Sequence, residues 1–278
     1  MARRGAGNVD DEEPRPGSAA AAWRKTAPPD RDRGRPEEFE PDVWIDDGPV
    51  RDEAAAAVSR ATSSPRRRAK LPDEVDEEIA RVAGPAWEGR VKDRLADAVR
   101  AYEGERYRDA RRILEGLLER VPSSVAVREL YGLTLYRMGK WRDATRELGA
   151  VEMLTGSVDH HPVIADCYRA LGNLDRVQEL WDELRRTGAS VDVLVEGRIV
   201  MAGALADSGD LRGAIQLLEQ GPVNVRRPQP HHLRLWYALA NLVERAGDPI
   251  RARSLFARIV AADPGFGDAA GRLRSLGG

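Results

Sequence analysis

Apolar residues recur at intervals of three and four positions from about residue 72 to the end of the chain. This spacing places them on one face of an α-helix and predicts an all-α fold for this part of the protein. Glycine, proline and polar residues interrupt the pattern at regular points and divide it into separate helices. The expected helices are a short one at 74–82, longer ones at 86–102 and 107–120, helix pairs within 125–153, 158–186, 191–220 and 231–262, and a last one at 266–276.

One short motif recurs between the two helices of each pair: a turn residue, a polar residue, three further residues and then a small apolar residue. Gly139–Ala144 is its clearest copy, and the first copy has Glu105 in place of the glycine. The glycine suits the left-handed conformation that ends a helix, and the next residue can cap the following helix. The copies close at Ala110, Ala144, Val177, Ala214 and Ala252, which are 33 to 38 residues apart.

A period in this range is typical of a solenoid, in which each helix pair buries its apolar face only against its neighbours. The last helix carries small and apolar residues on one stripe and arginines on the other side. Such a helix suits a cap that closes the open end of a stack. We therefore predict a right-handed α-solenoid of antiparallel helix pairs at 71–278, with the capping helix at 266–276.

The repeated positions resemble the tetratricopeptide repeat, whose 34-residue unit has characteristic aromatic, small and large apolar positions on its two helices. The resemblance covers about five copies in residues 87–264. The third and fourth copies lack the closing proline and have longer spacings, so we expect an irregular superhelix there. The last copy matches best, with Trp236, Leu239, Ala240, Val243, Gly247, Ala252, Phe256, Ile259 and Pro264.

The resemblance implies a function in protein binding, because the first helices of successive pairs in this family line a concave groove for a peptide or protein segment. Carboxylate recognition by paired arginines is one hypothesis, with Arg234 and Arg245 as the clamp. The alternative is that most of these side chains are solvated or paired with neighbours, as Arg169 with Asp166. The candidate groove residues are Tyr102, Glu129, Leu133, Tyr136, Arg137, Asp166, Arg169, Arg234, Tyr237, Asn241 and Arg245.

One specialised version of the family holds the C-terminal carboxylate of chaperones with lysines and asparagines from three repeats. The matching positions of the first three copies lack that set, and Lys92 is the one lysine nearby. The sequence therefore argues against a chaperone-tail adaptor.

Residues 1–70 differ from the rest, because charged residues, proline, glycine and alanine dominate them. Such a composition buries too little apolar surface to order a chain, and predicts a disordered tail. Phe39, Trp44 and Ile45 stand among acidic residues, and 49–61 could form a short helix. One hypothesis is a docking motif at 39–61 that folds back on the repeats; the alternative is a tail that only solubilises.

Charge and cysteine content narrow the class of partner and the compartment. The chain of 278 residues is 32% charged but has a net charge of only −2, which argues against nucleic acid and anionic membranes as partners. The single cysteine, Cys167, fits a reducing compartment. No apolar segment approaches the length of a membrane span or of a secretory signal. We expect a soluble cytoplasmic protein.

The remaining chemistry-bearing residues give no catalytic, metal or cofactor prediction. The pairs His160–His161 and His231–His232 have no Cys, Asp or Glu at metal-binding spacing, and we expect them at helix starts. Cys167 lies on a largely apolar face, where packing is the expected role. The sequence shows no phosphate-binding glycine loop, nucleophile elbow or His/carboxylate motif, so we expect no enzyme.

These observations favour a non-catalytic protein-interaction scaffold that binds a peptide or protein segment in the groove of the repeats. The alternative is a regulatory or nucleic-acid-associated protein, in which the basic run 66–70 contacts phosphate while the repeats hold a protein partner.

Overall fold

The computed structural model describes residues 71–277, and residues 1–70 and 278 lie outside the described part. Within 71–277 every regular element is a helix, which confirms the all-α prediction. The helices are α3 (Asp73–Ala83), α4 (Glu88–Glu103), α5 (Tyr107–Leu118), α6 (Val125–Arg137), α7 (Trp141–Thr155), α8 (His161–Ala170), α9 (Leu174–Thr187), α10 (Val191–Asp207), α11 (Leu211–Glu219), α12 (Pro230–Arg245), α13 (Pro249–Ala262) and α14 (Ala269–Ser275).

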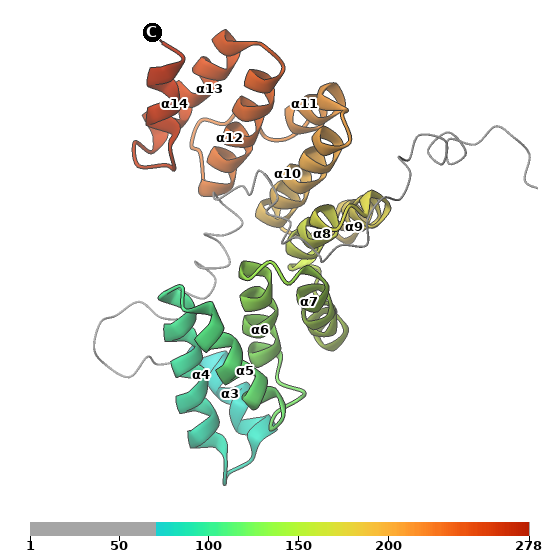
Figure 1. The fold of residues 1–278 in the computed structure, drawn as a ribbon, viewed down its shortest axis with the longest axis vertical. Helices are drawn as coiled ribbons and strands as arrows, with labels where there is room; N and C mark the ends of the chain where they lie inside the picture. The colour runs from blue at the N-terminus through green and yellow to red at the C-terminus, as the bar shows by residue number, and fades with distance from the viewer. Residues whose placement is uncertain (1–70, 278) are drawn as a thin grey trace, which may run out of the picture. The chain divides into compact units, whose positions relative to one another are not determined.

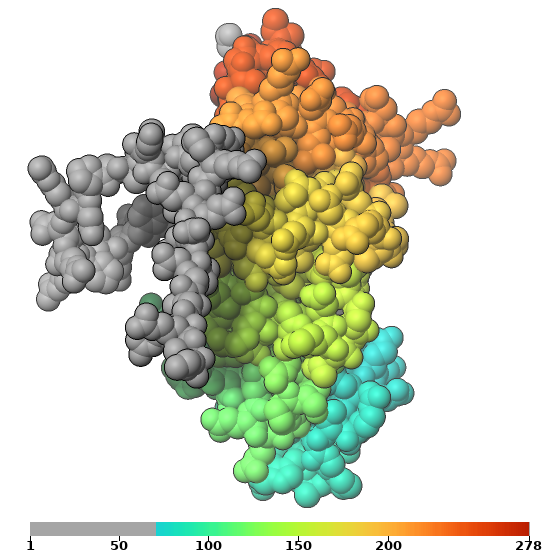
Figure 2. Space-filling model, turned by 90° about the vertical axis from the view of Figure 1, so that its right-hand side faces the viewer, coloured from blue at the N-terminus to red at the C-terminus, as the bar shows by residue number. Residues whose placement is uncertain are grey.

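The ten helices from α4 to α13 form five antiparallel pairs, and each pair packs against the next along the chain (Figure 1). Figure 2 shows the pairs in sequence order, from cyan at the base to orange at the top. Successive first helices also touch directly, as α8 touches α10 and α10 touches α12. The expected α-solenoid is confirmed. The capping helix is confirmed as well, because α14 packs on α13 and buries Ala269 completely.

The turns inside the pairs follow the predicted chemistry. Gly247 follows the end of α12 with φ of 84°, a left-handed conformation in which glycine has no steric penalty. Asp248 then accepts a hydrogen bond from the Arg251 N–H at 3.0 Å and so caps α13. Asn173 and Asp210 cap α9 and α11 in the same way. The first pair departs from this scheme, because Glu105 has φ of 56° and is the only described non-glycine residue with positive φ.

The small residue that closes the motif is completely buried in all five copies. Ala110, Ala144, Val177, Ala214 and Ala252 are all 0% exposed. A close approach of the two helices occurs at Gly132 on α6, where a Cβ atom would lie 2.7 Å from two side-chain atoms of Leu148 on α7. The repeated motif is therefore a packing device, as the sequence indicates.

Two clusters of buried apolar residues form the core, one built mainly from α3–α9 and the other from α11–α14. Helix α10 contributes to both, because it is apolar on both sides. Val200, Met201 and Ala204 belong to the first cluster. Val195 and Ile199 belong to the second. The described part of the chain holds no helix whose length and apolar character would let it cross a membrane.

Candidate binding surface on the first helices

Three successive first helices are joined by one polar network, which we call the first-helix strip: Tyr136 on α6, Asp166 and Arg169 on α8, and Asp207 on α10. The Tyr136 hydroxyl donates to Oδ2 of Asp166 at 2.6 Å. Arg169 donates to Oδ1 of Asp166 at 2.9 Å and to Oδ2 of Asp207 at 2.6 Å. Each bond to α6 or α10 crosses from one helix pair to the next. The strip therefore holds its side chains in fixed positions.

The electrostatics of the strip follow from its burial and its two carboxylates. Burial raises the pKa of the Tyr136 hydroxyl well above its usual range, and the adjacent Asp166 charge raises it further. Burial lowers the pKa of Arg169, but the charges of Asp166 and Asp207 outweigh this effect and raise it. At neutral pH the tyrosine is neutral and the arginine charged. With both carboxylates ionised, the strip carries one net negative charge.

The structure brings together Tyr136, Asp166 and Arg169, all three of which were candidates from sequence. Asp207 was not among them. The sequence feature that could have identified Asp207 is its position at the end of a first helix, because Tyr136 and Arg169 also lie at the ends of first helices. The expected local pair of Arg169 with Asp166 is present, but Arg169 also reaches the next repeat.

Several other candidate residues also contact a neighbouring repeat or the capping helix. Arg137 pairs with Glu105 at 3.8 Å, and Glu129 lies 3.3 Å from His160. Near the other end of the array the Tyr237 hydroxyl donates to Asp268 at 2.7 Å. Burial raises the pKa of Tyr237 to about 12, with a further contribution from Asp268.

Four candidates are buried rather than exposed. Tyr102 and Leu133 are 2% exposed and belong to the first core cluster. Arg234 and Asn241 are 4% exposed. Arg234 pairs with the equally buried Glu196 of α10 at 2.5 Å.

The hypothesis that Arg234 and Arg245 clamp one carboxylate is corrected by this geometry. The two residues are eleven positions apart on α12, which is about 16 Å along a helix. Arg234 already binds a carboxylate of its own protein, that of Glu196. Arg245 is exposed at the end of the helix and is left as a separate candidate contact.

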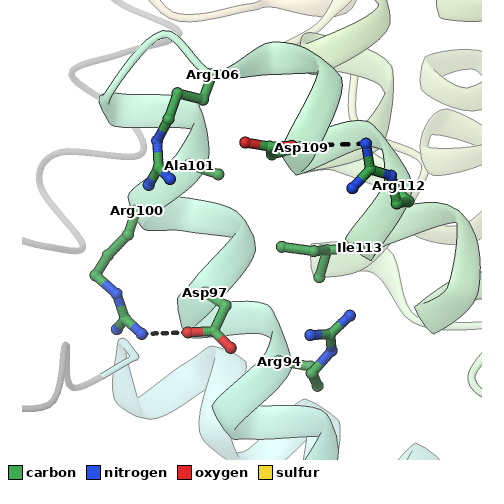
Figure 3. Close-up of a pocket in the computed structure, with 8 residues that line it drawn as sticks. All are labelled: Arg94, Asp97, Arg100, Ala101, Arg106, Asp109, Arg112 and Ile113. Carbon is green, nitrogen blue, oxygen red and sulfur yellow. Dashed lines mark hydrogen bonds and ion pairs between the residues drawn. The ribbon is translucent and has the colours of Figure 1, made fainter.

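Sequence analysis missed a pocket of about 360 Å³ between α4 and α5, which we call the arginine pocket (Figure 3). Arg100 pairs with Asp97, and Arg112 pairs with Asp109 at 3.7 Å. Arg94 and Arg106 form no ion pair with any residue of 71–277, so the pocket has an excess of positive charge. The sequence signal is charge at three-residue spacing on both helices. The pocket is lined by Arg94, Asp97, Arg100, Ala101, Arg106, Asp109, Arg112 and Ile113.

The two histidine pairs behave differently from each other. His232 lies in the first turn of α12, as expected of a helix start, and its Nδ1 accepts from the Gln229 N–H at 2.9 Å. His161 begins α8, and Glu152 and Glu183 place carboxylate oxygens near its ring. The sequence prediction concerned residues at metal-binding spacing along the chain, whereas these two glutamates reach His161 from α7 and α9.

Cys167 is fully buried, as its expected packing role requires, and burial raises the pKa of its thiol well above the usual range. Several sequence hypotheses lie outside the described residues and stay predictions. These are the docking motif at 39–61, with Phe39, Trp44 and Ile45, and the basic run at 66–70.

Residues 205–276 match the family model for the tetratricopeptide repeat. The match begins near the end of α10 and continues through α14, and so includes the best-matching copy of the sequence motif. The matched segment carries the tetratricopeptide repeat. The preceding helix pairs, from α4 to α9, continue the same helix-pair architecture toward the N-terminus of the described part.

Two solved structures match part of this chain, and the first has a similar architecture. A thermophilic tetratricopeptide-repeat protein of Thermus thermophilus is 18% identical with a TM-score of 0.53, over 67% of this chain and 98% of its own. Nearly identical tetratricopeptide-like repeats of a Podospora anserina kinesin light chain are 18% identical with a TM-score of 0.47, over 62% of this chain and 94% of theirs. A search of the curated proteins finds no match. The likeness to the Thermus protein concerns the fold alone.

Proposed function

We propose that the tetratricopeptide-repeat array is a non-catalytic scaffold that binds a peptide or protein segment across its first helices. Tetratricopeptide repeats in general mediate protein–protein interactions. The observation that carries the proposal is the first-helix strip, in which polar side chains from three consecutive first helices are fixed by hydrogen bonds between repeats. A surface that is ordered before binding loses less conformational entropy when a partner arrives.

The chemistry of the strip favours a particular kind of contact. Asp207 is 46% exposed and carries one of the two carboxylates of the strip. A basic side chain or an amide of the partner can donate to it, with the strength of a charge-assisted hydrogen bond. Tyr136 lies beside Trp141 with the ring centroids 5.5 Å apart, so an aromatic surface adjoins the polar one.

The arginine pocket provides a second contact of opposite charge. Arg94 and Arg106 retain charge that no described carboxylate neutralises, and guanidinium groups bind carboxylates in a bidentate geometry. An acidic side chain or a C-terminal carboxylate of the partner suits this pocket. The partner segment would then carry both a donor group and an acidic group.

Affinity capture with quantitative mass spectrometry tests the proposal. The wild-type chain is compared with a double variant, Asp207→Lys and Arg245→Glu, which reverses two exposed charges at the ends of first helices. The matched control is Asp182→Lys with Arg185→Glu, which exchanges the members of an exposed ion pair on α9. We expect the double variant to lose partners that the control retains. Equal recovery by all three proteins would exclude the first helices as the binding surface.

The arginine pocket is tested separately on a recovered partner. Replacing Arg94 and Arg106 by alanine should weaken binding and reduce its dependence on salt, because a charged contact is lost. The control replaces Arg90 and Arg108, two exposed arginines on the same helices outside the pocket. If both double variants bind with the wild-type affinity, the pocket is not a contact site.

A further inference from the structure

His161 is a fully buried histidine whose ring nitrogens lack hydrogen bonds. Its side chain is 1% exposed, and neither Nδ1 nor Nε2 has a hydrogen-bond partner in the described part of the chain. Nε2 lies 3.2 Å from Oε1 of Glu152, but not in hydrogen-bond geometry. A buried polar group without a partner costs free energy, so such a group calls for an explanation.

Two glutamates complete a cluster around this ring. Glu152 comes from the last turn of α7, His161 is the first residue of α8, and Glu183 comes from α9. One ligand atom from each residue lies within 4.8 Å of the other two. The residues are far apart in sequence, and only the stacking of the second and third helix pairs brings them together.

We propose that Glu152, His161 and Glu183 bind one divalent transition-metal ion, and that Zn²⁺ fits the site best. Imidazole nitrogen and carboxylate oxygen are both ordinary zinc ligands. Mg²⁺ and Ca²⁺ prefer sites made of oxygen ligands alone, so the histidine nitrogen makes them less suitable than Zn²⁺. A bound ion would give the buried imidazole the partner that it lacks. Two carboxylates would balance the charge of the ion.

The distances suit a small ion. Ligand atoms about 2.1 Å from a tetrahedral zinc ion lie about 3.4 Å from each other. The separation of 3.2 Å between His161 and Glu152 is close to this value without any movement. Rotation of the glutamate side chains can bring the third oxygen nearer, and the 35% exposure of Glu152 leaves access for water as a fourth ligand.

The ion would act as a cross-link inside the array. Glu152 belongs to the second helix pair, whereas His161 and Glu183 belong to the third. A ligand that binds the folded state alone stabilises it. Metal binding would therefore raise the stability of this junction, independently of what the first-helix strip binds.

The experiment is a Zn²⁺ titration of the full chain without an affinity tag, after chelator treatment, by competition with a chromophoric chelator at neutral pH. We expect one tight ion per chain. Glu152→Gln and Glu183→Gln should each weaken the binding roughly tenfold or more, because each removes a charged ligand. These glutamates are partly exposed, so their variants test the site without emptying the core. Zn²⁺ should also raise the melting temperature of the wild type more than that of either variant.

Two control variants retain the three residues of the site. Glu179→Gln removes an exposed carboxylate one turn from Glu183 on α9, and His231→Gln removes a histidine of the other pair. Both should bind Zn²⁺ like the wild type. The proposal is overturned if the wild type binds no stoichiometric Zn²⁺, or if Glu152→Gln and Glu183→Gln bind it as tightly as the controls.

Discussion

The first and last helix pairs of the array share one plan but reach it with different residues. In both, an alanine with no exposed surface closes the turn motif, Ala110 in the first and Ala252 in the last. The last pair turns at Gly247 and caps α13 with Asp248. The first turns at Glu105, and Arg106 gives α5 no side-chain cap. The buried small residue is therefore common to both pairs, whereas the turn glycine and the side-chain cap add stability and are missing from the first pair.

The two pairs also differ in how an ion pair joins them to their neighbours. Arg234 of the last pair binds Glu196 of α10, and both side chains are about 5% exposed or less. Glu105 of the first pair faces Arg137 of α6, but the glutamate side chain is 68% exposed and the distance is 3.8 Å. A buried charge depends strongly on its partner, whereas an exposed one is solvated by water.

The largest expected difference between the two pairs lies in these contacts. Arg234→Met should lower the free energy of unfolding by about 3–5 kcal/mol, because it removes the Arg234 guanidinium from the buried Glu196 carboxylate. Glu105→Gln should change it by less than about 1 kcal/mol. Urea unfolding followed by circular dichroism measures both. The double variant with Glu196→Met should lose less than the sum of the two single variants; a purely additive result would contradict the coupling.

The second difference is the helix cap. Asp248→Ala should destabilise the protein by about 1 kcal/mol, because the Arg251 N–H loses its acceptor at the start of α13. Arg106→Ala, at the matching position of the first pair, should have an effect within about 0.5 kcal/mol. The same unfolding experiment decides between them. Similar losses of stability in both variants would show that the Asp248 cap stabilises the protein no more than Arg106 does.

Substitution of the two turn residues, Glu105 and Gly247, should change the stability of the protein in opposite directions. Glu105→Gly relieves a left-handed conformation that costs a side-chain-bearing residue about 1 kcal/mol, and should stabilise the protein by about 0.5 kcal/mol after loss of the exposed contact with Arg137. Gly247→Ala should destabilise it by about 1 kcal/mol for the same reason. Thermal melting of the two variants measures the shifts. A shift of equal sign in both would contradict the comparison.

The last expected effect is a loss of stability of the last pair that is confined to alkaline pH. The folded-state pKa of Tyr237, about 12, is above the unfolded value of about 10. Its contribution to stability is therefore complete below pH of about 10 and is lost as the pH rises through about 12. Unfolding midpoints over this range should fall more steeply for the wild type than for Tyr237→Phe. Parallel pH profiles would show that the hydroxyl has no such role.

The fold was predictable because its determinants are local in sequence. A turn residue, a cap such as Asn173 or Asp210, and a small residue lie within a few positions of one another, and their period fixes the stack. The outward-facing positions were less predictable. Tyr102 and Leu133 were assigned to the groove by family register, but each first helix contacts neighbours on more than one side and buries them.

The ion pairs of the candidate site could not be predicted from the sequence of a single repeat. Arg169 binds Asp207 and Arg234 binds Glu196, each across 38 positions, and such pairs depend on the exact stacking of the helices. Glu152 and Glu183 reach His161 for the same reason. The arginine pocket is the exception, since charges at three-residue spacing on α4 and α5 already indicate it.

Helix α10 supplies buried residues to both parts of the core. Val200 and Met201 face one cluster, and Val195 and Ile199 face the other. In a linear array, unfolding spreads from one unit to the next through the energy of their shared interface. Loss of α10 would remove side chains from both clusters at once. Cooperativity between the two ends of the molecule therefore depends on this helix, and a weakened α10 should turn one melting transition into two.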